Sequence, residues 1–156
     1  MSRIIWTYLF CLAITSASAT ELKWLTDLSK AMAQAKTENK AVLVLFTGSD
    51  WGDICARMDI EVFQSASFSD YAKNKLVLVQ VDFPHAKPQS DILKRTNAQL
   101  KAKYKVEGIP TTLVLDAKGT VLGQHLGYSA GAGPKSVMDR IDRWLKKQST
   151  APRPAS

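Results

Sequence analysis

The residues with the clearest chemical potential lie in one short stretch, FTGSDWGDIC, from Phe46 to Cys55. An apolar run ends at Phe46, and Trp51 precedes the start of an amphipathic segment. At the start of a helix, backbone N–H groups and the helix dipole stabilise a thiolate. Two cysteines separated by two residues would carry out thiol–disulfide exchange here, because one attacks a disulfide and the other resolves the mixed disulfide. The first of these two positions holds Gly52, so only Cys55 supplies sulfur.

Cysteine and histidine counts limit the other chemistry of the chain. The sequence has two cysteines, and Cys11 lies in an N-terminal apolar segment. Without it, Cys55 has no partner for an internal disulfide, and its thiol is either inert in the core or available for intermolecular exchange. One cysteine with His85 in a proline loop and His125 on a hairpin strand does not form a metal site, so we predict neither metal nor cofactor. We expect both histidines to be exposed.

The N-terminus has the pattern of a secretory signal peptide. Arg3 is followed by an apolar stretch over 4–14 and by the small-residue sequence Ala-Ser-Ala at 17–19. We predict a signal peptide over 1–19 and an exported chain, periplasmic or secreted. The apolar stretch is too short for a membrane span of about 20 residues, so the chain is not expected to span the membrane after cleavage.

Length and charge fit one globular domain, predicted over 20–148, with a disordered tail at 149–156. The formal charge is +7, from 21 basic and 14 acidic side chains. The lysines are spread along the predicted helices, which is typical of a solvated basic surface and compatible with attraction to anionic envelope surfaces. No basic motif interleaved with aromatic residues indicates nucleic-acid binding.

Periodicity predicts alternating helices and strands. An apolar run without polar alternation, 41–46, is typical of a central strand buried on both faces. Ile54, Cys55, Met58 and Val62 are expected on one inward face of the next helix, which directs the Cys55 sulfur to the core. The remaining predicted elements are helices over 24–38, 90–105 and from 133 onward, and strands at 76–82, 112–115 and 121–126, the last two joined by a turn at 116–119. This order predicts an α/β fold, a mixed four-stranded central sheet with helices on both faces.

Several motifs in this order resemble the thioredoxin superfamily. They are Trp-x-x-x-Cys at a strand-to-helix turn and Gly-Ile-Pro-Thr at 108–111 before the third strand. More narrowly, FTGSDW, EVF at 61–63 and VDFP at 81–84 resemble bacterial exported thioredoxin-like proteins of the thiol–disulfide interchange, disulfide-isomerase-like kind. The resemblance extends over roughly 24–145 and implies a thioredoxin-like fold.

The resemblance also implies roles for individual residues. Trp51 matches the tryptophan of the family's Trp-Cys-x-x-Cys site, Gly52 the attacking cysteine and Cys55 the resolving cysteine. Pro110 matches the family's cis-proline, beside which extended substrate binds to the backbone. Trp51, Ile109 and Pro110 would then wall a peptide-binding groove.

Two departures from the family pattern bear on activity. Gly52 has no side chain and cannot attack a disulfide. Leu45 stands where many thioredoxins have a buried carboxylate that moves the proton of the resolving cysteine. Ordinary dithiol cycling is therefore not available to a monomer, and we expect a buried, slowly reacting Cys55.

Three functional hypotheses remain open. The first is a degenerate thioredoxin-fold protein that binds extended or unfolded polypeptide beside Pro110. The second is a one-cysteine thiol–disulfide oxidoreductase or isomerase that uses Cys55 with a small external thiol such as glutathione. The third is a structural envelope partner that binds through its basic surface.

Overall fold

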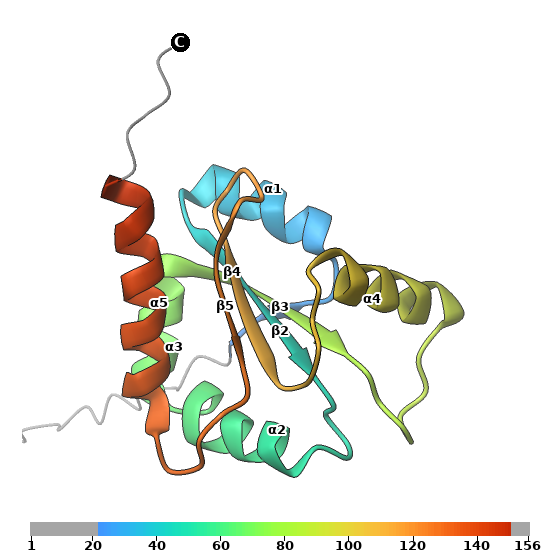
Figure 1. The fold of residues 1–156 in the computed structure, drawn as a ribbon. Coiled ribbons are helices and arrows are strands. Elements are labelled where there is room, and N and C mark those ends of the chain that lie inside the picture. Colours follow the sequence, from blue (N-terminus) through green and yellow to red (C-terminus); the bar gives the residue numbers. More distant parts are fainter. Residues whose placement is uncertain (1–21, 151–156) are drawn as a thin grey trace, which may run out of the picture.

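A five-stranded mixed sheet organises the protein, and the computed structural model describes residues 22–150 (Figure 1). The strand order is β1-β3-β2-β4-β5, in which β1, β3 and β2 run parallel and β4 and β5 are antiparallel additions. The α/β class and the mixed sheet are as predicted, but the sheet has five strands instead of four. The strands are β1 (Trp24–Leu25), β2 (Ala41–Thr47), β3 (Leu76–Asp82), β4 (Thr111–Leu115) and β5 (Val121–Leu126).

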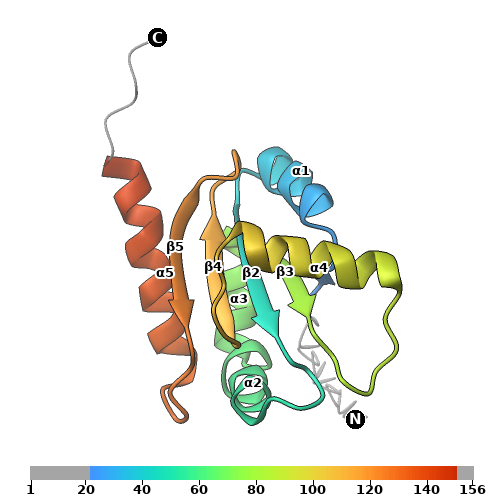
Figure 2. The same cartoon turned by 45° about the vertical axis from the view of Figure 1, so that its right-hand side comes forward.

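Helices cover both faces of this sheet (Figures 1 and 2). They are α1 (Leu28–Glu38), α2 (Asp53–Met58), a π-helical turn η1 (Asp59–Phe63), α3 (Ala66–Lys75), α4 (Asp91–Lys103) and α5 (Gly133–Thr150). One apolar cluster joins α1 and α4 to the sheet, and a second joins α2, η1, α3 and α5 to the opposite face. Every residue of β2 is buried, which explains its continuous apolar sequence.

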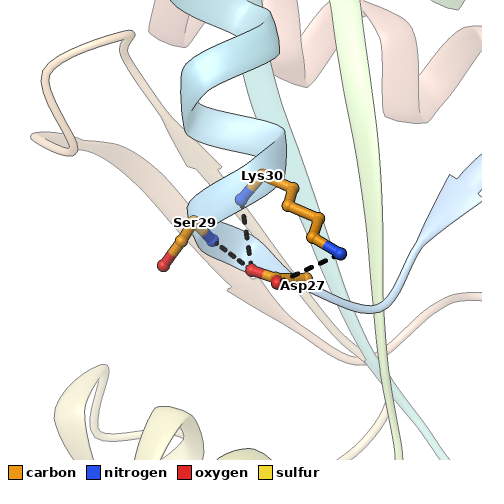
Figure 3. Close-up of polar contacts among 3 residues, drawn as sticks. All are labelled: Asp27, Ser29 and Lys30. Atoms are coloured by element: carbon orange, nitrogen blue, oxygen red, sulfur yellow. Dashed lines mark hydrogen bonds and ion pairs between the residues drawn. The ribbon is translucent and has the colours of Figure 1, made fainter.

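The first helix begins later than predicted. Trp24 and Leu25 form β1 and pair with Leu78 and Val79 of β3. The helix starts after Asp27, whose Oδ1 accepts hydrogen bonds from the backbone N–H groups of Ser29 at 2.8 Å and Lys30 at 3.1 Å (Figure 3). An aspartate at this position satisfies donors that have no partner within the helix. Trp24 and Leu25, which lie before this cap, are therefore free to extend the sheet.

The helix predicted to carry Ile54 through Val62 is α2 continued by η1, and the structure adds a further helix, α3, that was not predicted. The π-helical turn η1 ends at Phe63, and a new helix, α3, starts after Ser65, whose Oγ accepts from the N–H of Phe68. The prediction for Ile54 is wrong, because its side chain is exposed while Cys55, Met58 and Val62 are buried. Buried positions three, four or seven residues apart share a face, whereas Ile54 lies about 100° around the helix from its neighbour Cys55.

The predicted C-terminal boundary of the domain falls within α5. Helix α5 continues to Thr150, two residues past the predicted boundary at 148. The remainder of the predicted tail and the whole predicted signal peptide, 1–19, lie outside the described residues. Within 22–150, no helix combines the length and apolar character needed to cross a bilayer.

Candidate active site at the turn between β2 and α2

Gly52 occupies the N-cap position of α2, directly after the turn that follows β2. Its N–H donates to the carbonyl of Gly48 at 3.0 Å, and its own carbonyl accepts from Ala56 at 2.9 Å. Its φ of −88° and ψ of 101° lie in the extended region that any residue adopts. The backbone at position 52 therefore does not require glycine.

The sulfur of Cys55 lies immediately beneath Gly52. A Cβ atom at position 52 would stand 2.8 Å from Cys55 Sγ and 3.2 Å from Cys55 Cβ. Cys55 is only 5% exposed, as predicted, and its Sγ accepts a hydrogen bond from the N–H of Gly48 at 3.5 Å. Positions 52 and 55 thus have the adjacency that a two-cysteine site needs, with one sulfur present.

A cleft of about 400 Å³ reaches Cys55 from the side of the sheet that carries β1 and β3. Leu45, 6% exposed, forms part of its apolar wall, so no ionisable group occupies the position of the family's buried carboxylate. Trp24, Ala56 and Ile60 add to the apolar wall, and polar side chains line the remainder: Thr47, Ser49, Asp59, Gln64, Gln80 and Lys87. The thiol is therefore bordered by a cleft of mixed polar and apolar character that the sequence did not indicate.

Asp50 fastens the turn to the loop that follows β3. Its carboxylate accepts backbone hydrogen bonds from His85 at 2.9 Å, Ala86 at 2.8 Å and Lys87 at 2.9 Å. These hydrogen bonds, that of His85 first, lower the pKa of Asp50 to about 2 because they favour the charged form. The neighbouring Ser49 adds two hydrogen bonds to the Asp82 carboxylate, from its N–H at 2.9 Å and from its hydroxyl at 2.6 Å.

The same loop holds Trp51. The indole N–H donates to the carbonyl of Phe83 at 2.7 Å, and the imidazole of His85 stacks on the indole, with ring centroids 4.6 Å apart and planes inclined by 7°. His85 is exposed, as predicted, but it covers one face of Trp51. The indole also packs on Gly48, yet Trp51 remains 44% exposed, so part of its ring is open to a partner.

Ile109 and Pro110 lie at the entrance to β4. The peptide bond between them is cis, the geometry that the resemblance implied. Pro110 is buried and its carbonyl accepts from the N–H of Gly127 at 2.7 Å. Ile109 is half-buried, and within the described chain neither its N–H nor its C=O has a hydrogen-bond partner. These two groups are available to an extended chain.

The predicted site residues come together in two sets. Gly52 and Cys55 adjoin each other. Trp51 contacts Phe83 and His85 of the loop after β3, and its indole packs on Gly48, where an added Cβ would stand 2.5 Å from the ring. Phe83 relates Trp51 to the segment of Ile109 and Pro110, because its carbonyl accepts from the Trp51 indole and its side chain packs against the same apolar cluster as Ile109. The sequence did not indicate Asp50, Phe83 or Leu126, whose roles depend on contacts with residues far away in the chain.

Leu126 and Ile54 extend the apolar surface near the site. Leu126, 52% exposed, pairs with Thr111 in the sheet and lies against Gly108, where an added Cβ would meet it at 3.0 Å. Ile54 is exposed on the first turn of α2. Together with Trp51, they give exposed apolar side chains next to both the Gly52 turn and the Pro110 segment.

The histidines do not build a metal centre. Over residues 22–150, no three His, Cys, Asp or Glu side chains gather as metal ligands. His125 is half-buried instead of exposed, and burial, with a smaller contribution from Arg140, lowers its pKa.

Comparison with known proteins agrees with this architecture. A thioredoxin-like domain model matches residues 28–141. The disulfide bond reductase DsbH of Chlamydia pneumoniae is 35% identical over 120 residues, which cover 77% of this chain and 71% of DsbH. The chain belongs to the thioredoxin-like family. The thioredoxin-related protein DsbJ of the same organism is 29% identical over 143 residues, which cover 81% of this chain and 41% of DsbJ.

Solved structures extend the comparison to geometry. A DsbH oxidoreductase structure superimposes with a TM-score of 0.73 at 32% identity, covering 81% of this chain and 85% of that one. A thioredoxin from Thermus thermophilus gives a TM-score of 0.58 at 17% identity, over 81% of this chain and 89% of that one, and supports the fold alone. The sequence and structural neighbours together identify a thioredoxin-superfamily protein of the thiol–disulfide interchange kind.

Proposed function

We propose that this protein binds extended or unfolded polypeptide at the surface around Trp51 and Pro110 and does not cycle a disulfide by itself. The observation that carries the proposal is Gly52, which adjoins the sulfur of Cys55 where a second sulfur is needed. A thiolate at position 55 alone can form a mixed disulfide but has no internal partner to resolve it. Binding is the part of the family's activity that does not need this partner.

The surface has the features expected of a site for extended chains. The unpaired N–H and C=O of Ile109 offer main-chain hydrogen bonds, as in strand-addition modes of peptide recognition. Trp51, Ile54 and Leu126 offer exposed apolar area for side chains. The hydrogen bonds of Asp50 and Trp51 to the loop after β3 fix this surface before a client arrives, which reduces the entropy lost on binding.

A binding assay with an unfolded client tests the proposal. Fluorescence anisotropy of labelled, reduced and alkylated unfolded protein should rise on titration with the full chain. Leu126→Ser, which removes exposed apolar area, should weaken binding roughly tenfold, whereas Val121→Ser at the far end of β5 should not. The parent should show no insulin reduction above background. Absence of client binding, or equal loss in both variants, would contradict the proposal.

The cleft beside Cys55 favours a second candidate function, a one-cysteine exchange reaction with a small external thiol. Lys87 and the amides of Gln64 and Gln80 line a space beside Cys55 large enough for a charged, polar molecule. In such a reaction the Cys55 thiolate attacks a small disulfide, one new S–S bond forms, and one small thiolate leaves. A different external thiolate, for example on a client protein, then attacks the small group of this mixed disulfide. A disulfide forms between these two, and Cys55 leaves in its reduced form, so the net reaction transfers the small thiol to the client.

Mass spectrometry of the intact protein separates this candidate from the first. A Cys11→Ser chain, whose only sulfhydryl is Cys55, is incubated with oxidised glutathione under native conditions. Addition of one glutathione would support the exchange reaction. If glutathione were added only after unfolding and not under native conditions, the exchange reaction would be ruled out and polypeptide binding would remain as the proposed function.

Export is part of the proposal and rests on the sequence at 3–19. An extracytoplasmic location would give the protein access to unfolded exported chains and to oxidised thiols. N-terminal analysis of the protein isolated from its own cells should find a chain that starts near Thr20. Recovery of the chain with its first 19 residues, in the cytoplasmic fraction, would contradict export.

A further inference from the structure

A second surface lies on the face of the sheet that carries α1 and α4, separate from the Gly52 turn. A groove of about 830 Å³ runs between the first turns of α1, the length of α4 and the tip of the β4–β5 hairpin. The hairpin tip closes one end, since an added Cβ at Gly119 would meet the terminal methyl of Met32 at 3.6 Å. Figure 2 shows α1 and α4 on the same side of the sheet.

The floor of the groove is apolar. Half-buried side chains from the two helices form it, and Ile92 at its edge is 72% exposed. The floor residues are Leu28, Met32, Leu93, Leu100 and Tyr104. A partner with an apolar face would remove this surface from water, at about 25 cal/mol for each Å² buried.

The rim of the groove is basic. Lys30 of α1, Lys103 of α4 and Lys118 of the hairpin line it, against a single acidic residue, Asp27. The Asp27 carboxylate is already engaged, because it caps α1 through two backbone N–H groups and lies 4.0 Å from the Lys30 ammonium (Figure 3). The Lys103 ammonium lies 5.2 Å from the centre of the Tyr104 ring, at the edge of the floor. The groove therefore presents a net positive rim above an apolar floor.

From this complementarity we propose that the groove docks an acidic, amphipathic segment of a partner protein, with its apolar side on the floor and its carboxylates at the three lysines. The hydroxyl groups of Thr26, Ser29, Ser90 and Thr96 also line the groove. Ser90 Oγ accepts from the N–H of Leu93 at 3.3 Å and can still donate. The Thr96 hydroxyl donates to the carbonyl of Ile92 at 2.9 Å and can still accept. A polypeptide can use these remaining capacities as hydrogen-bond partners, whereas a hydrocarbon chain cannot. These hydroxyls therefore favour a protein segment over a lipid as the occupant.

Labelled synthetic peptides provide the probe. Two peptides share one amphipathic apolar pattern, and their polar positions are all glutamate in one and all lysine in the other. Anisotropy with the full chain should show binding of the glutamate peptide at low ionic strength, roughly tenfold or more stronger than that of the lysine peptide, and weakening with added salt. Equal binding of the two peptides would overturn the proposal.

Charge-reversal variants locate the site. Lys103→Glu with Lys118→Glu should weaken the glutamate peptide roughly tenfold or more. The matched control, Lys36→Glu with Lys94→Glu, makes the same change of net charge at exposed positions of α1 and α4 that do not line the groove. Ile92→Asp should weaken binding as well, and its high exposure makes loss of folding unexpected. An equal effect of the groove and control pairs would reduce the interaction to general charge attraction and overturn the proposal.

The same variants distinguish a protein segment from two other possible occupants of the groove. Dimerisation in sedimentation experiments that the groove pair abolishes would assign the groove to a second copy of the chain. Groove-dependent retention on phosphatidylglycerol vesicles, without peptide binding, would assign it to anionic lipid. Either result would overturn the proposal of a protein segment.

Discussion

The two halves of the turn between β2 and α2 differ in how fully their groups are engaged. In the first half, Ser49, Asp50 and Trp51 make hydrogen bonds to the loop after β3, and Trp51 also stacks on His85. In the second half, Gly52 contributes only backbone hydrogen bonds, and the nearest group to the place of its missing side chain is the Cys55 sulfur.

We call Ser49, Asp50 and Trp51, with the loop after β3 that they bind, the scaffold of the site. The difference between the two halves shows that the scaffold and the reactive group are structurally independent. No contact in the first half depends on the side chain at position 52. A cysteine can therefore be absent there without loss of the arrangement that would position a client. The comparison predicts that the side chain at position 52 can be changed while the scaffold stays intact, and that hydrogen bonds of the scaffold can be removed without an effect at position 52.

The largest effect is expected from Gly52→Cys. The new Cβ would lie 2.8 Å from Cys55 Sγ, so the Cys55 side chain must shift slightly. A sulfur on the new Cβ could then reach Cys55 Sγ at the disulfide bond length of about 2.05 Å. The first N–H groups of α2 would stabilise the new thiolate. We expect insulin reduction roughly tenfold or more above that of the parent.

Gly52→Ser is the matched control, because it adds a side chain of similar size that cannot form a disulfide. A folded Gly52→Cys protein that forms no 52–55 disulfide under mild oxidation and reduces no insulin would show that Gly52 does not correspond to the attacking cysteine.

Leu45→Asp in the Gly52→Cys protein would test the missing base. The carboxylate would enter the cleft wall near Cys55 and accept its proton, so the resolving step should accelerate. Loss of the apolar side chain and burial of a polar group should lower the free energy of unfolding by about 3–5 kcal/mol. Leu45→Asn in the same protein buries a polar group of similar size that cannot accept the proton. Equal rates of insulin reduction for the Leu45→Asp and Leu45→Asn proteins would rule out proton transfer.

Asp50 gives a way to loosen the scaffold alone. Its pKa is lowered in the folded protein, so its contribution to stability is present above the ordinary aspartate pKa of about 3.9. The contribution is lost as the pH falls from there through about 2, where Asp50 takes up a proton. NMR should show that the amides of His85, Ala86 and Lys87 lose protection through this range, measured as their exchange rate relative to that of an unstructured chain at the same pH.

Asp50→Asn should give the same loss of amide protection at neutral pH, because a neutral amide is a weaker acceptor for three N–H groups. The environment of Cys55 should stay unchanged, as judged by its rate of labelling. If the mutation left the three amides protected at neutral pH, the carboxylate would not be what holds the loop.

The parts of the fold that follow from sequence are those with a repeated local signal. The continuous apolar runs of β2 and β3 and the turn at 116–119 needed no long-range information. β1 was not predicted, because a strand of two residues, Trp24 and Leu25, is too short to show an alternating pattern. Only its pairing with β3 identifies it as a strand. α3 was not predicted, and its start depends on one capping residue, Ser65.

The candidate site divides in the same way. Cys55 and Gly52 follow from spacing within one segment. The Asp50 hydrogen bonds connect positions 35 to 37 residues apart, and the Trp51–Phe83 bond connects positions 32 apart. Sequence periodicity carries no information on such pairs, so the support for Trp51 became visible only in the folded chain.

The smallest effect on stability is expected at Lys105, in the segment that leads from α4 to Pro110. Lys105 has a φ of 52°, in the left-handed region, and the N–H of the next residue, Val106, donates to the carbonyl of Lys101 at 2.9 Å to close the end of α4. A side chain in this conformation costs roughly 1–2 kcal/mol, and glycine avoids this cost but loses more entropy on folding. Lys105→Gly should therefore raise the free energy of unfolding by about 0.5–1 kcal/mol in urea denaturation. Lys105→Ala is the control, since it removes the amine but keeps the strained Cβ, and it should give no such gain. If the alanine and glycine variants gained equally, the lysine charge, and not the backbone, would limit stability at this end of α4.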